Sequence, residues 1–173
     1  MGKPPHSPYP PDLDDDPALP GGEFGDLVDT VVENVDWANH RSPRWQARRV
    51  QLRRCRLTGA ELGEAALSDV TFEECRLDLV GLRLAKLERV VFRDCRMGEC
   101  DFYEASLKDI LFERCELRQA NFTSVKIQRV ELRGCGLAGL GGVEALRTVR
   151  MPWDDVLENA ALFASALGLE IVD

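Results

Sequence analysis

A strict twenty-residue repeat is the feature of this sequence that most constrains its fold. Five cysteines stand twenty residues apart without interruption, at Cys55, Cys75, Cys95, Cys115 and Cys135. Within each twenty, a large apolar residue recurs at every fifth position from Leu52 to Leu137, and a small or β-branched apolar residue stands two positions before each. Neither the 3.6-residue period of a helix nor the two-residue period of a strand fits a period of five. A short extended segment followed by a turn does, so the repeat predicts a solenoid.

The five-residue units resemble the pentapeptide-repeat family, whose units read roughly Ala-Asp/Asn-Leu-x-x. Examples are AELGE from Ala60, CDFYE from Cys100 and ANFTS from Ala120. The resemblance implies an all-β solenoid, a right-handed quadrilateral β-helix with four units per coil. Cys or Val in place of Ala, and Phe in place of Leu, change the volume of the core and leave the predicted topology unchanged.

With four units per coil, residues twenty apart are predicted to stack at the ~4.8 Å spacing of hydrogen-bonded strands. One inward column then contains Phe72, Phe92 and Phe112, and the next contains the five cysteines. Six cysteines could form the disulfide framework of a secreted protein. Parallel side chains in a buried column cannot bridge one another, however, so we predict reduced thiols that pack as small apolar residues.

The sequence predicts four segments. Residues 1–24 are rich in Pro and Asp and are predicted to be a disordered tail, with a docking tail as the alternative. Residues 25–49 are predicted to form a degenerate first coil or an N-terminal cap. Residues 50–142 form the β-helix, and residues 143–173 form a C-terminal cap with a helix at about 152–167.

The section from 40 to 49 interrupts the regular pattern. Its Trp45 is too large for an ordinary flanking position of the repeat. Together with Arg41, Arg44, Arg48 and Arg49, this tryptophan could form an anion or nucleic-acid patch. A solvated and poorly formed coil is the preferred interpretation, because the surrounding chain is acidic and no direct nucleic-acid partner is predicted.

The C-terminal helix begins after Pro152 and ends before Gly168. We expect the apolar face of this helix to cover the end of the core, because a β-helix without a cap would expose its core and its unpaired strand edges there. The resemblance also implies a possible twofold contact here, because such helices mediate dimers in several family members. The candidate residues for the cap or a homodimer are Phe163, Leu167, Leu169 and Ile171.

The net charge of −8 lies at the two ends of the chain, because residues 50–140 contain equal numbers of acidic and basic residues. One column alternates in sign along the coils, through Arg53, Glu73, Arg93, Glu113 and Arg133. Pairs of this kind favour the register and indicate no partner.

One face is more acidic than the others and is the candidate partner-binding site. Its residues are Glu61, Glu64, Asp101, Glu104 and the neighbouring Tyr103. The resemblance implies a possible activity for such a face, because some family members bind DNA gyrase or topoisomerase IV as mimics of duplex DNA. A few acidic residues are sparse beside DNA, which carries one charge per ~1.7 Å.

The sequence argues against an enzyme. Its two histidines, His6 and His40, lie in the tail and in the irregular section, so no nucleophile–base pair is evident. No glycine-rich phosphate loop or four-ligand metal pattern appears, and we expect no cofactor and no metal. The chain has no apolar run of the ~20 residues that a membrane helix needs, so we expect no membrane contact and a cytoplasmic location.

These observations predict a non-catalytic protein-interaction module with an unidentified protein partner. The alternative is a DNA mimic that binds gyrase or topoisomerase IV and modulates it or protects it from quinolone-type inhibitors.

Overall fold

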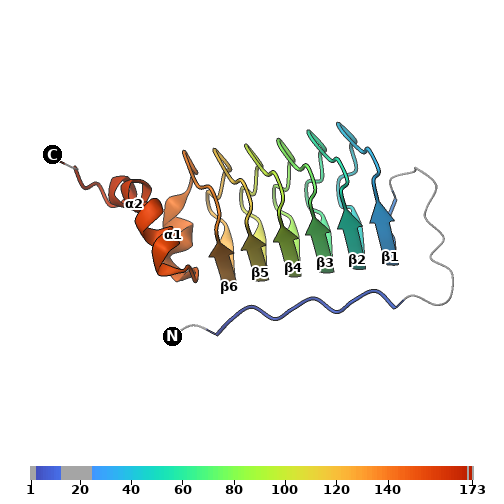
Figure 1. The fold of residues 1–173 in the computed structure, drawn as a ribbon. Helices are drawn as coiled ribbons and strands as arrows, with labels where there is room; N and C mark the ends of the chain where they lie inside the picture. Colours follow the sequence, from blue (N-terminus) through green and yellow to red (C-terminus); the bar gives the residue numbers. More distant parts are fainter. Residues whose placement is uncertain (1–2, 13–24, 171, 173) are drawn as a thin grey trace.

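The structure is a computed structural model that describes residues 3–12, 25–170 and 172. Its main body is a stack of coils in which one parallel sheet has its strands in sequence order (Figure 1). The strands are β1 (Leu27–Glu33), β2 (Gln46–Arg53), β3 (Ala66–Glu73), β4 (Lys86–Arg93), β5 (Ser106–Glu113) and β6 (Lys126–Arg133).

Neighbouring strands pair in the predicted twenty-residue register. Val70 pairs with Val90 and Phe72 with Phe92, for example. Isolated parallel bridges continue the same register on the other sides of the coil, as between Arg56 and Arg76. The predicted β-solenoid of pentapeptide units, four per coil, is therefore confirmed, and helices follow it at the C-terminal end.

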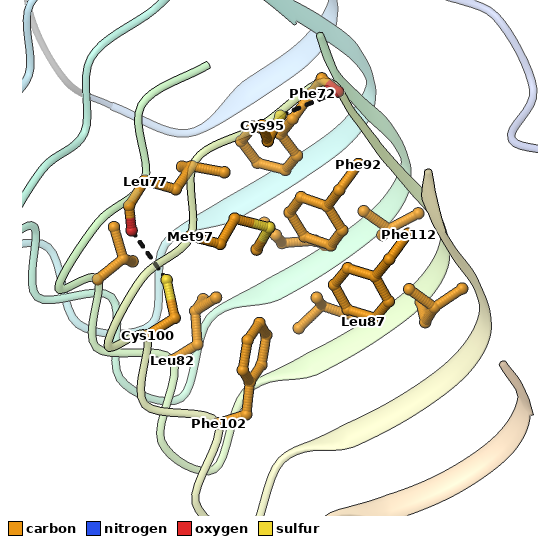
Figure 2. Close-up of a cluster of buried hydrophobic side chains, with 14 of the residues drawn as sticks. Phe72, Leu77, Leu82, Leu87, Phe92, Cys95, Met97, Cys100, Phe102 and Phe112 are labelled. Carbon is orange, nitrogen blue, oxygen red and sulfur yellow. Dashed lines mark hydrogen bonds between the residues drawn. The ribbon is translucent and has the colours of Figure 1, made fainter. Parts of the chain in front are cut away.

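The inward positions form one continuous apolar core. Figure 2 shows the column of Phe72, Phe92 and Phe112, whose rings lie one above another. Adjacent ring centroids in this column are 5.0 Å apart, and the ring planes are within 8° of parallel. Phe102 meets Phe112 edge-on from the neighbouring side of the coil, at 6.2 Å. Aromatic contacts thus join two sides of the core as well as successive coils.

The chain turns a corner at every fifth residue, and each corner residue has a positive φ. These residues run from Asp29 (φ 49) to Gly139 (φ 69), and most of them are not glycine. A left-handed conformation costs an L-residue about 1–2 kcal/mol. Hydrogen bonds between coils hold the corners in this conformation, as where the Arg54 N–H donates to the Glu73 carbonyl at 2.9 Å.

Residues 27–46 form a complete first coil and not an irregular section. Trp45 is buried in an inward position with 1% exposure, and its indole N–H donates to the Gly25 carbonyl at 2.8 Å. Ala47, which occupies the large central position of the same unit, is also buried. The prediction of a poorly formed coil was wrong because the large and small side chains exchange places within this unit, which keeps the core filled.

The N-terminal segment 3–12 lies extended along the side of the solenoid, from β6 towards β1 (Figure 1). The structure thus differs from the predicted disorder over these residues. Three of their backbone N–H groups, at His6, Tyr9 and Asp12, donate to solenoid carboxylates. The remainder of the predicted tail, residues 1–2 and 13–24, lies outside the described residues.

The C-terminal cap begins with a 3-10 helix, η1 (Val143–Thr148), whose Leu146 is buried against the end of the core. Arg150 then pairs with Glu131 and covers part of the outer edge of β6. Two short helices follow, α1 (Trp153–Glu158) and α2 (Ala160–Ala166). The single helix predicted for 152–167 is therefore divided, with Asn159 (φ −103, ψ 15) between its two parts.

Among the described residues, no helix is long and apolar enough to span a bilayer.

Candidate interaction surfaces

Two of the arginines in the predicted patch, Arg41 and Arg44, pair with the predicted acidic face, whereas Arg49 pairs with Asp29 elsewhere on the solenoid. Arg41 lies one coil before Glu61, with Nε 3.1 Å from the carboxylate, and Arg44 approaches Glu64 at 3.8 Å. All four side chains are well exposed, so each pair contributes little to stability. The pairing nevertheless reduces the net charge that either group could present to a partner.

Asp101 is also engaged within the solenoid. Its carboxylate accepts hydrogen bonds from Arg83 at 3.0 Å, from the Asn121 side chain at 2.9 Å and from the Tyr103 N–H at 3.0 Å. The Arg83 guanidinium also lies 4.5 Å from the centre of the Tyr103 ring. A hydrogen bond to the exposed Glu104 raises the pKa of Tyr103. The five candidate residues are therefore exposed or half-buried on this face, with three of the four carboxylates paired to arginine.

The column through Arg53, Glu73 and Arg93 is a ladder of ion pairs, as expected. Arg93 Nε lies 2.7 Å from the Glu113 carboxylate, and Arg53 lies 3.5 Å from Glu73. These contacts join successive coils in register and supply no binding site.

A second ladder, which sequence reasoning missed, follows the corner residues at twenty-residue intervals. We call it the corner ladder; its members are Asp29, Arg49, Asp69, Arg89, Asp109 and Arg129. Each aspartate forms a bidentate pair with the arginine one coil further on. Its sign alternation could have been read from the sequence.

The aspartates of the corner ladder are charged groups set into the solenoid wall. The side chains of Asp69 and Asp109 are only 7% and 3% exposed. Hydrogen bonds from Arg129 hold the pKa of Asp109 at about 2, and those from Arg49 do the same for Asp29. Burial acts to raise the pKa of Asp69, but its hydrogen bonds outweigh this effect and leave the pKa lowered. All three aspartates are thus ionised at neutral pH.

The cysteines are free and buried, as predicted. Cys95 Sγ lies 3.5 Å from the Phe72 carbonyl, and Cys100 Sγ lies 2.8 Å from the Leu77 carbonyl, both marked in Figure 2. Burial raises the pKa of Cys100 to about 12. A protonated, enclosed thiol is a poor nucleophile and a poor metal ligand. The described residues contain no cluster of three or more potential metal ligands.

The C-terminal helices and the residues that follow them leave large apolar side chains exposed. We call this the cap surface; its residues are Trp153, Leu157, Leu167, Leu169 and Val172. Of the predicted cap or dimer residues, Phe163 packs against the core, whereas Leu167 and Leu169 are 77% and 61% exposed. Ile171 lies outside the described residues. Core closure thus depends on η1 and Phe163, and the cap surface faces solvent.

Comparison with known proteins also identifies the repeats. The sequence profile described as "Pentapeptide repeat region" matches residues 46–122 and 84–141, which together span more than half of the chain. No curated protein matches the chain significantly.

Several solved structures are similar to the chain at low sequence identity. A trypsin-treated form of QnrB1, a plasmid-mediated fluoroquinolone resistance protein, is 16% identical, with 86% of this chain and 91% of that chain covered and a TM-score of 0.36. A pentapeptide repeat protein from the Arabidopsis thaliana thylakoid lumen is 17% identical, with 73% and 71% covered and a TM-score of 0.34. HetL, involved in heterocyst differentiation regulation in the cyanobacterium Nostoc, is 15% identical, with 76% and 92% covered and a TM-score of 0.26. On the match to the family profile, the chain belongs to the pentapeptide-repeat family.

Proposed function

We propose that this chain is a non-catalytic protein-interaction module that associates with a second copy of itself through the cap surface. The observation that carries the proposal is the exposure of large apolar side chains there: Trp153 is 70%, Leu157 55% and Leu167 77% exposed. Exposed apolar side chains of this size mark interaction surfaces where they form a patch.

The cap surface is available for such a contact because other residues close the solenoid. Leu146 of η1 is buried at the end of the core, and Phe163 packs beside it. Helices α1 and α2 contain no buried residue. A twofold arrangement would place the same helices from two copies against each other, which is the usual geometry of a homodimer.

Acidic side chains around the cap surface give the association a definite salt dependence. Asp154 and Glu158 are exposed on α1 beside the apolar residues. In a symmetric dimer these like charges approach each other, and added salt screens their repulsion. We therefore expect the dimer to strengthen as ionic strength rises, whereas a contact made by opposite charges would weaken.

The test is size-exclusion chromatography with light scattering on two double variants. Trp153→Gln/Leu167→Gln removes two apolar side chains of the cap surface. Leu79→Gln/Leu84→Gln is the matched control, because these residues are similarly exposed, at 55% and 50%, on the solenoid. We expect the first variant to be monomeric at concentrations where the control is dimeric. Equal masses for the two variants would contradict the proposal.

The alternative function, binding to DNA gyrase or topoisomerase IV as a DNA mimic, depends on the acidic face. One observation favours it: Glu104 is exposed there beside Tyr103. The pairing of Glu61, Glu64 and Asp101 with arginines leaves little net charge to imitate DNA. A gyrase supercoiling assay with and without ciprofloxacin tests it. Inhibition or drug protection that Glu61→Lys/Asp101→Lys/Glu104→Lys abolishes would support this function, and no effect at tens of micromolar would exclude it.

A further inference from the structure

The N-terminal segment 3–12, here called the strap, contacts the corner ladder at regular intervals. The His6 N–H donates to Asp109 at 3.0 Å, the Tyr9 N–H to Asp69 at 3.1 Å and the Asp12 N–H to Asp29 at 3.1 Å. Donors are three residues apart in the strap, and acceptors are forty residues apart in the solenoid. Each step of three strap residues therefore crosses two coils.

The spacing of the donors along the strap matches the spacing of the acceptors along the solenoid, because three residues of an extended helix are about as long as two coils are high. A polyproline II helix rises about 3.1 Å per residue, or about 9.3 Å over three residues. Two coils at the spacing of hydrogen-bonded strands measure about 9.6 Å. A mismatch of a few tenths of an ångström per step allows three successive hydrogen bonds without distortion. A β-strand, at about 3.3 Å per residue, rises about 9.9 Å over three residues and matches the coil spacing equally well, but residues three apart in a strand face opposite sides, so successive donors would not all point at the solenoid. An α-helix rises only about 4.5 Å over three residues.

The prolines of the strap stand where this geometry needs them. Each donor follows a proline, at Pro5, Pro8 and Pro11, and these three prolines are half-buried against the solenoid. Proline fixes φ near −65° and has no N–H, so it favours the extended helix and adds no donor that would need a partner. The strap therefore consists of three consecutive x-Pro-X triplets, and the last residue of each donates its backbone N–H to the solenoid.

The acceptors are held in place by contacts within the solenoid, independently of the strap. Arg129 holds the Asp109 carboxylate through two hydrogen bonds of 2.6 Å, and Arg89 holds Asp69 at 2.6 and 2.9 Å. An ionised carboxylate has about four acceptor sites, so each can still accept an N–H. With the strap in place Asp69 and Asp109 are nearly buried, so the strap amides pair with carboxylate oxygens that have little remaining access to water.

From this geometry we infer that the corner ladder is a binding site for polyproline II segments, occupied in this structure by the strap of the same chain. The contacts recognise backbone N–H groups at every third residue of the bound segment. One side chain also contributes, because the Tyr9 ring lies 5.8 Å from the Arg89 guanidinium. The ligand class is a proline-rich protein segment of consecutive x-Pro-X triplets. The strap acts as a built-in competitor that a partner segment must displace. This inference does not depend on the proposed association through the cap surface.

Proline substitution at the donor positions tests the inference without altering the solenoid. His6→Pro/Tyr9→Pro/Asp12→Pro removes all three donated N–H groups and preserves the preference for polyproline II. Ser7→Pro is the matched control, because the Ser7 N–H makes no hydrogen bond within the part of the chain that the structure describes. Tyr9→Ala removes the ring and keeps the N–H at this position, so it measures the contribution of the ring contact with Arg89 apart from that of the hydrogen bond to Asp69.

The measurement is fluorescence anisotropy of a labelled synthetic peptide, residues 3–12, titrated with each full-length variant. We expect the triple-proline variant to bind the peptide at least tenfold more tightly than the wild type or Ser7→Pro, in which the strap still occupies the site. A peptide with proline at the three donor positions should bind at least tenfold more weakly than the unmodified peptide. A loss of this size corresponds to one charge-assisted hydrogen bond.

Three results would overturn the inference. The first is equal binding of the two peptides, and the second is no saturable binding to a triple-proline variant that melts like the wild type. The third comes from amide exchange followed by NMR on the unmodified chain. The His6, Tyr9 and Asp12 amides should exchange at least tenfold more slowly than in the free peptide, whereas Ser7 should not. Exchange of all four at the free-peptide rate would show that the strap does not occupy the ladder.

Discussion

Truncation of Phe92 tests the stacked core most sharply. Phe92 is 1% exposed, and its ring centroid lies 5.0 Å from those of both Phe72 and Phe112. Replacing a buried phenylalanine with alanine costs about 3–5 kcal/mol, and a stacked aromatic pair adds about 0.5–1.5 kcal/mol beyond burial. Because Phe92 has a stacked neighbour on each side, we expect Phe92→Ala to lower the free energy of unfolding by an amount at the upper end of the truncation range, about 4–5 kcal/mol.

The assay is equilibrium unfolding in urea, with the m-value compared between variants to confirm that the same surface unfolds. Phe72→Ala is the first control and should cost about 1 kcal/mol less, because its ring is stacked on Phe92 alone. Thr71→Ala, half-buried on the opposite side of the same strand, should change stability by less than about 1 kcal/mol. A loss under about 1 kcal/mol for Phe92→Ala would refute the stacked register.

Further predictions concern the end of the repeat, the corner ladder and the thiols. Gly142→Ala should lower the free energy of unfolding by about 3 kcal/mol, because a Cβ at this φ of 72° would lie 2.4 Å from the backbone of Phe122. Gly168→Ala, which has the same φ but no atom within 4 Å of the added Cβ, should lower it by about 1 kcal/mol. Urea melts measure both losses, and equal losses would contradict the reasoning. Because the pKa of Asp109 is about 2 in the fold and 3.8 is the ordinary value, the unfolded chain takes up the proton first, and stability should fall as the pH drops from about 4 to 2. Asp109→Asn should show a shallower fall in acid denaturation, and an unchanged slope would count against the pairing. All six buried thiols should resist a disulfide reagent in the native protein and react on unfolding in urea; rapid native labelling would place them outside the core.

The sequence allowed the repeat core to be predicted nearly residue by residue, because a period of twenty maps directly onto stacked coils. Phe72, Phe92 and Phe112 illustrate this, since their column follows from spacing alone. Trp45 was misjudged because each position was considered separately. Its bulk is offset by Ala47 two residues later in the same unit, and only the packed coil shows that both fit.

The surfaces were harder to predict, since they depend on contacts between residues far apart in the chain. Composition indicated disorder for the strap because a Pro-rich segment cannot form a core of its own. Its hydrogen bonds instead use carboxylates up to 103 residues away, as between His6 and Asp109. The break in the C-terminal helix at Asn159 was also missed, because its apolar periodicity continues across the break.

The proposed association through the cap surface is tested most directly by the mass of the unmodified chain in solution. Sedimentation equilibrium over a range of concentrations at moderate salt would measure it. The account predicts a reversible approach to twice the 19.4 kDa of one chain, shifted to lower concentration by added salt. A mass that stays at 19.4 kDa up to hundreds of micromolar would contradict it.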